Sequence, residues 1–152
     1  MPTARSQQFG DLQYDESEAI TFPSGLPAFE SERNFVLVTT PSTKPLVFLQ
    51  SLERPDLCFV TLPLLTVDPG YQLSVSAEDL RVLGLTEVFS PSRQPQIGPE
   101  ITCLAIMSLT DSRPTANLLA PVVIGNSSRK AVQAIRADSL YSHETVLEGL
   151  CS

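Results

Sequence analysis

The sequence predicts an all-β domain with one short helix. Thirteen prolines are spread through 152 residues, and because each proline removes a backbone donor and fixes one dihedral angle, they argue against long helices. The prolines lie at the edges of short apolar runs, a pattern that is typical of strands and turns. A chain of this length, of which 42% is hydrophobic, can bury a core of its own. We therefore expect residues 1–152 to form a single domain.

Eight of the apolar runs are expected to be strands. In chain order they cover residues 12–14, 19–22, 35–40, 46–52, 57–62, 102–109, 115–124 and 131–135. The run at 102–109, TCLAIMSL, is apolar on both faces. This pattern predicts a central strand of the sheet, covered on both sides.

The single helix is predicted in the stretch SAEDLRVLGL. Ser76 is a suitable N-cap, and Glu78 places negative charge at the positive end of the helix dipole. Gly84 provides the left-handed residue that commonly ends a helix. Because a helix of about two turns is unstable alone, we expect Leu80 and Leu83 to dock it on the sheet.

Two further segments are expected to lack regular structure. Residues 89–100, FSPSRQPQIGPE, contain three prolines and a glycine, which predicts an exposed loop. The C-terminal tail from about residue 141 is expected to be flexible.

A proline stands inside the apolar run TANLLAPVVI, residues 115–124. In a central strand Pro121 would delete a ladder hydrogen bond, so its strand should lie at a sheet edge or carry a bulge. An edge could pair with another chain, and Asn117 could offer its amide to that partner. A bulge would instead turn a barrel corner, with Asn117 satisfying its own loop. The stretch alone favours the bulge.

Charge and targeting signals limit the classes of partner. Ten basic and seventeen acidic residues give a net charge of -7, which disfavours binding to nucleic acid and suits a basic protein partner. The N-terminal stretch has no signal-peptide pattern, and no segment reaches the ~20 apolar residues of a membrane helix. Three separated cysteines form no CxxC pair. We expect a cytoplasmic protein with reduced thiols and neither a metal nor a cofactor.

A search for catalytic patterns leaves one weak candidate. The seven glycines form no nucleotide-binding loop, and His143 is the only histidine. A small β-barrel hydrolase could use His143 as a base, but Ser142 and Glu144 are adjacent to it in sequence and point apart from it. The sequence therefore favours a non-catalytic binding protein, with the hydrolase as the alternative.

Four segments in the same order resemble the FliW family of flagellar assembly factors. They are FGDLQYDESEAITFPSGLPAFE (9–30), FLQSLERPDLCFV (48–60), the DPGY…EDLRVLGL stretch (68–85) and TANLLAPVVIGNSSRKAVQ (115–133). The resemblance implies a small antiparallel β-barrel-like domain that works by binding proteins. It also implies two partners, the translational regulator CsrA and flagellin. In that family the factor relieves repression of flagellin synthesis by CsrA and is itself titrated by flagellin.

Three groups of residues are candidates for the partner-binding surface. They are the segment with Thr115, Asn117, Leu118 and Pro121, the turn with Pro23, Gly25, Leu26 and Pro27, and the charged turn with Glu53 and Asp56. Prolines reduce the ordering cost of binding, and charges at a rim can steer a basic partner. The alternative for the proline turn is a tight plug at one end of the barrel. Phe29, Phe35, Phe48 and Phe59 are expected in the core.

Overall fold

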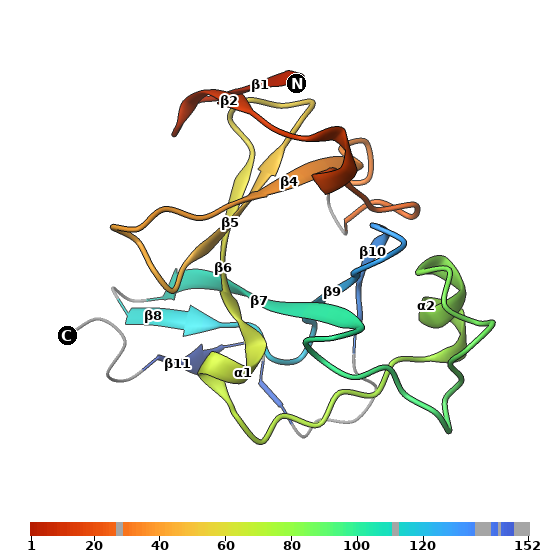
Figure 1. Ribbon diagram of the computed structural model, residues 1–152. Helices are drawn as coiled ribbons and strands as arrows, with labels where there is room; N and C mark the ends of the chain where they lie inside the picture. Colours follow the sequence, from red (N-terminus) through yellow and green to blue (C-terminus); the bar gives the residue numbers. More distant parts are fainter. Residues whose placement is uncertain (27–28, 111–112, 136–140, 143, 148–152) are drawn as a thin grey trace.

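The computed structural model describes residues 1–26, 29–110, 113–135, 141–142 and 144–147. These residues form an antiparallel β-structure with little helix (Figure 1). Its strands are β1 (Thr3–Ser6), β2 (Gly10–Gln13), β3 (Ile20–Thr21), β4 (Asn34–Val38), β5 (Val47–Ser51), β6 (Cys58–Pro63), β7 (Ile101–Thr110), β8 (Arg113–Ala116), β9 (Val122–Gly125), β10 (Ala131–Gln133) and β11 (Thr145–Val146). Its helices are η1 (Glu16–Glu18, a 3₁₀ turn), α1 (Leu64–Val67) and α2 (Ala77–Val82).

The main sheet has the strand order β10-β9-β7-β6-β5-β4-β3, with every pair antiparallel. Its two ends approach each other, because the Thr21 nitrogen of β3 donates to the Arg129 carbonyl at 3.0 Å, just before β10. A single parallel bridge joins Thr21 and Lys130 at the same place. The sheet is therefore curled into the barrel-like form that the sequence resemblance implies.

Strand β7 is the centre of the fold. Along one edge, the first part of β7 (residues 101–104) pairs with β9 and the last part (residues 107–110) pairs with β8. The other edge of β7 pairs with β6. Its side chains alternate between two hydrophobic clusters, as successive strand residues must: Cys103 belongs to the first cluster and Leu104 to the second. The predicted central strand is thus confirmed.

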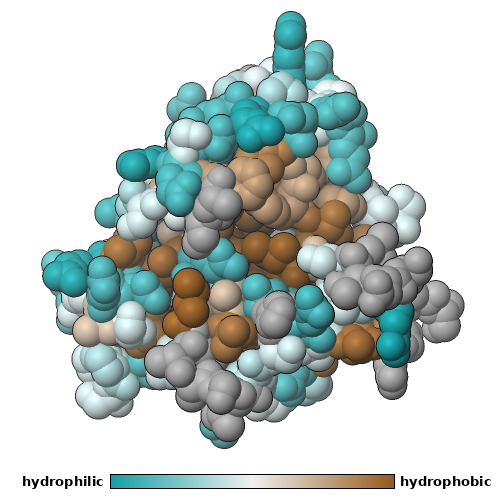
Figure 2. All heavy atoms as spheres, turned by 180° about the vertical axis from the view of Figure 1, so that it is seen from behind, coloured by the Kyte–Doolittle hydropathy of each residue, from teal (hydrophilic) through white to brown (hydrophobic). Residues whose placement is uncertain are grey.

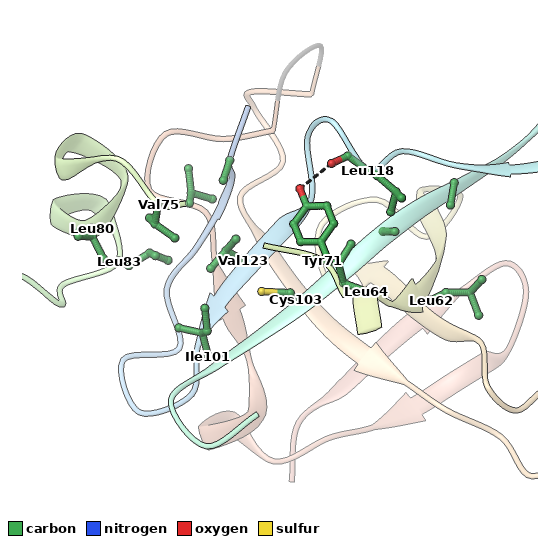
Figure 3. Packing of buried hydrophobic residues seen from close by; sticks show 14 of the residues in the cluster. Leu62, Leu64, Tyr71, Val75, Leu80, Leu83, Ile101, Cys103, Leu118 and Val123 are labelled. Carbon is green, nitrogen blue, oxygen red and sulfur yellow. Dashed lines mark hydrogen bonds between the residues drawn. The ribbon is translucent and has the colours of Figure 1, made fainter. Parts of the chain in front are cut away.

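The first cluster lies under the helices and the C-terminal strand. Leu64 of α1 and Leu80 of α2 are buried in it, as is Leu83, which follows α2 (Figure 3). The Ser76 hydroxyl caps α2 by accepting from the Asp79 nitrogen at 3.1 Å. The short helix therefore begins and docks as the sequence predicts.

The second cluster lines the inner face of the curled sheet. Its buried members come from β3 to β10 and from the turn after β3: Ile20, Phe22, Leu26, Phe35, Leu49, Leu57, Leu104, Val122, Ile124 and Ala131. Phe22 and Phe35 meet edge to face, with ring centroids 5.3 Å apart, an arrangement that adds to their burial energy.

The hairpin β1–β2 covers the outer face of β5. The Ser6 hydroxyl donates to the buried Gln50 side-chain oxygen at 2.8 Å, and the rings of Phe9 and Phe48 meet edge to face at 5.0 Å. The Gln7 nitrogen also donates to the Pro55 carbonyl at 2.8 Å. The hairpin thereby fixes the turn between β5 and β6.

Several features differ from the expectations. The predicted strand at 115–124 is two strands, β8 and β9, separated by residues 117–121. A second helix, α1, follows β6 directly, and β1 and β11 were not predicted. The described part of the tail from residue 141 is packed, since β11 pairs with β8 and Leu147 is 5% exposed.

Candidate partner-binding surface

The segment between β8 and β9 is a closed loop built on Asn117. On β7 two residues separate Leu104 from Met107, whereas on the opposite side five residues, 117–121, separate the partners of these two residues. The Asn117 nitrogen still pairs with the Ile106 carbonyl at 2.9 Å. Its side-chain oxygen accepts from the nitrogens of Leu119 and Ala120 at 3.1 and 3.0 Å, which is an Asx turn. The bulge interpretation of this stretch is therefore confirmed.

The loop is also held from outside. The Leu118 carbonyl accepts from the Tyr71 hydroxyl at 2.6 Å (Figure 3), and the Leu118 nitrogen donates to the Ser142 carbonyl at 3.0 Å. The rings of Tyr71 and Tyr141 stack with centroids 4.1 Å apart. The backbone of this loop is thus bonded within the protein and is not presented as an open edge.

Burial separates the predicted contact residues of this segment. Thr115 and Leu118 are 4% and 3% exposed, and Pro121 is also buried. Asn117 is half-buried and is the one of the four whose side chain reaches the surface. Only Asn117 can therefore contact a partner without a rearrangement.

The proline turn after β3 folds inward. Gly25 has φ +72, and a Cβ there would lie 2.6 Å from the Glu30 Cα atom, so only glycine fits. Leu26 is 2% exposed and lies in the second cluster, while Pro23 is half-buried. This geometry matches the plug alternative. Pro27 lies outside the described residues.

The turn between β5 and β6 carries two carboxylates with different roles. Glu53 accepts from the nitrogens of Arg33 and Asn34 at 2.9 and 2.8 Å, so it holds the start of β4 although its residue is exposed. Asp56 forms a two-point ion pair with Arg54, with the closer contact at 2.9 Å. The bonded Arg54 guanidinium holds the pKa of the Asp56 carboxyl below its usual value. The Asp56 side chain is exposed despite this ion pair and can contact a partner.

Asp56 borders a shallow depression of about 440 Å³. Its other lining residues come from the hairpin β1–β2 and the same turn: Arg5, Ser6, Gln7, Gly10, Asp11 and Pro55. Sequence analysis did not predict that Asp11 and Asp56 border the same depression, because their proximity depends on the docking of β1–β2 on β5. No local pattern reports that contact.

Two kinds of reactive group, metal ligands and cysteine thiols, can be assessed in the described residues. No three of their His, Cys, Asp and Glu side chains lie close enough to hold a metal ion, and His143 is outside them. Cys103 is buried, which raises the pKa of its thiol to about 12, and partial burial also raises that of Cys58. Neither thiol is set up as a nucleophile. Within the same residues, no helix is long and apolar enough to cross a bilayer.

Apolar side chains remain partly open on the inner face of the curled sheet. The half-buried members of the second cluster are Phe29, Leu37, Val47, Phe59 and Ile106. Seen from behind, apolar side chains gather in the middle of the molecule beneath a hydrophilic upper part (Figure 2). Of the four phenylalanines expected in the core, Phe35 and Phe48 are buried, whereas Phe29 and Phe59 are only half-buried.

Comparison with known proteins agrees with the sequence resemblance. The model of the family described as FliW protein matches residues 3–147. The flagellar assembly factor FliW of Syntrophomonas wolfei is 31% identical over 139 residues, covering 90% of this chain and 83% of the relative. That of Bacillus velezensis is 25% identical over 147 residues, covering 95% and 96%.

A solved structure shows the same fold. The crystal structure of the flagellar assembly factor FliW superposes with a TM-score of 0.80 at 26% identity, covering 96% of each chain. The match therefore extends over nearly the whole fold. By sequence along nearly its whole length and by structure, this chain belongs to the FliW family.

Proposed function

We propose that this protein is a non-catalytic flagellar assembly factor that acts in the cytoplasm by binding other proteins. The observation that carries the proposal is the match of residues 3–147 to the FliW family. The similar proteins of Syntrophomonas wolfei and Bacillus velezensis are named flagellar assembly factors.

The proposed partners are a CsrA-like translational regulator and flagellin. Binding of the regulator would relieve its repression of flagellin synthesis, and unexported flagellin would titrate the factor and restore repression. The net charge of -7 supports a regulator that is basic enough to hold RNA, because opposite charges accelerate encounter and favour one partner over another. The factor itself contacts neither nucleic acid nor membrane in this proposal.

The proposed contacts are limited to side chains that reach the surface. Asp56 and Glu53 are exposed, and Asn117 and Pro23 are half-buried, so these four can form part of a contact. The buried candidates Thr115, Leu118, Pro121, Gly25 and Leu26 hold the loops that present them. Pro27, outside the described residues, stays a sequence-based prediction.

Titration calorimetry and size-exclusion chromatography test the function directly. The purified protein is mixed with the CsrA-like protein and, separately, with flagellin encoded in the same genome. We expect a stoichiometric complex in each mixture, and added flagellin should release RNA-binding activity of the regulator. The absence of both heat and co-elution with either protein would reject the proposal.

A further inference from the structure

Strand β4 has one edge that is only partly covered. β3 pairs with it at Ile20–Phe35 and Thr21–Asn34 and then ends. The Leu52 nitrogen donates to the Asn34 carbonyl at 2.9 Å, so Asn34 is hydrogen-bonded to the chain of β5. In an antiparallel pair only every second residue bonds to the neighbouring strand, so the residues that bond to β5 next are Val36 and Val38. The backbone N–H and C=O of Leu37 therefore point away from β5. Within the described part of the chain, no group bonds to them there.

The 3₁₀ turn η1 explains why the edge is open. The register of β3 and β4 would place Glu18 opposite Leu37 if the strand continued backward. Instead Asp15 accepts from the Ser17 nitrogen at 2.9 Å and begins a turn that ends at Ala19. The chain leaves the sheet at this point, so the last residues of β4 lack a neighbouring strand.

A second open edge faces the first. The Tyr14 nitrogen donates to the Pro2 carbonyl at 3.1 Å. Because alternate residues of β2 bond to β1, the N–H and C=O of the preceding residue, Gln13, point away from β1. Both edges border one cavity of about 220 Å³, lined by Leu12, Gln13, Tyr14, Glu18, Val36, Leu37, Val38 and Thr39. β2 and β4 both lie in the upper part of the molecule (Figure 1). The cavity is smaller than the ~300–1,000 Å³ usual for small-molecule sites, and five of its eight lining residues belong to β2 and β4.

The N-terminal segment that supplies one wall of this cavity is acidic. Residues 6–32 contain six acidic side chains and no basic one: Asp11, Asp15, Glu16, Glu18, Glu30 and Glu32. Glu18 lines the cavity itself. The Arg129 guanidinium donates to the Glu18 backbone carbonyl at 2.8 Å, and among the described residues no bond from it to the Glu18 carboxylate is found. A segment that enters the cavity therefore gains from a positive side chain.

We propose that the edge of β4 accepts an extended segment of a partner protein, and that this segment carries a lysine or arginine. The segment adds a strand beside β4, with its backbone bonded to the N–H and C=O of Leu37 and its basic side chain beside Glu18. This goes beyond the proposed function, because it assigns a surface and a mode of binding that hold for any partner with this chemistry.

The first test uses amide spectra of the labelled protein and two synthetic peptides. Both peptides alternate threonine and valine, and they differ only in a central lysine or glutamate. We expect the lysine peptide to shift the Leu37 and Gln13 amide signals and to slow their hydrogen exchange, and the glutamate peptide to do neither. Equal effects of the two peptides, or shifts confined to another surface, would overturn the proposal.

Matched variants give the second test. Glu18→Lys should weaken the lysine peptide by at least about tenfold, whereas Glu87→Lys, an exposed acid beyond α2, should leave it unchanged. Leu37→Pro removes the outward N–H without deleting a ladder bond, which edge strands tolerate, and should abolish the protection that the lysine peptide gives to the Gln13 amide. If Leu37→Pro fails to fold, Glu18→Lys decides alone. Protection of Leu37 that grows with protein concentration, without peptide, would mean that a second copy of this chain occupies the edge and would also overturn the proposal.

Discussion

The side-chain oxygen of Asn117 lies 3.0 Å from the backbone nitrogen of Ala120 and accepts its hydrogen bond. It also accepts from Leu119 at 3.1 Å, so one amide oxygen closes the loop that separates β8 from β9. The Asn117 amide was predicted to contact a partner. Because its oxygen also closes this turn, a substitution of Asn117 should change the free energy of unfolding.

Replacing Asn117 by alanine should therefore destabilise the protein. Two backbone donors lose their acceptor, and we expect the free energy of unfolding to fall by about 1–2 kcal/mol in chemical denaturation. Asn117→Asp keeps an acceptor oxygen and should lose less. An Asn117→Ala variant with unchanged stability but weaker partner binding would show that the residue acts as a contact.

Gly25 should be irreplaceable in the turn after β3. A left-handed conformation costs an L-residue about 1–2 kcal/mol, and the Cβ of Gly25→Ala would also overlap the Glu30 backbone. We expect a loss of stability above about 2 kcal/mol. Gly10→Ala is the matched control, because Gly10 has φ +73 with no atom within 4 Å of the added Cβ. Equal losses for the two variants would exclude the overlap as a cause.

The C-terminal strand should contribute to stability. Leu147 is 5% exposed in the first cluster, so Leu147→Ala should lower the free energy of unfolding by about 2–3 kcal/mol. Val146, which is 39% exposed, provides the control: Val146→Thr keeps the branched shape and should change stability by less than about 0.5 kcal/mol. A silent Leu147→Ala would support the flexible tail that the sequence predicts.

Burial of Cys103 should appear in the pH dependence of stability. Because the folded pKa is raised from 9.0 to about 12, the neutral thiol favours the folded state below pH 9, and this contribution is lost as the pH rises above 9. Between pH 8 and pH 10, the reduced wild type should lose roughly 1 kcal/mol more stability than Cys103→Ala. Equal slopes for the two proteins would mean that the thiol ionises as readily folded as unfolded.

Local sequence patterns predicted the elements whose signals are local. The apolar runs of β4 to β7 and the capped helix α2 were found at their places, because periodicity and capping depend on neighbours in the chain. β1 and β11 were missed since TARS and TV are not apolar runs. They are strands because their backbones pair with β2 and β8. Helix α1 was missed because LLTV reads as a continuation of β6.

The candidate site was predicted less well for the same reason. Glu53 was selected as a surface charge, yet its carboxylate bonds to the backbone of Arg33 and Asn34, twenty and nineteen residues away. Pro121 did mark an irregularity, but the Tyr71 hydroxyl that supports the loop comes from 47 residues before Leu118. The open edge of β4 depends on where η1 leaves the sheet. Such contacts exist only once the strands are paired.

The position of β7 in the chain has a consequence for biosynthesis. Both hydrophobic clusters need Ile101–Thr110 and strands that follow it in the chain, so more than roughly the first two thirds of the protein leaves the ribosome before either can close. Until then the meander β4–β5–β6 has no partner for its Cys58–Pro63 edge, and apolar side chains stay in water. Neither cluster can therefore close until most of the chain has emerged.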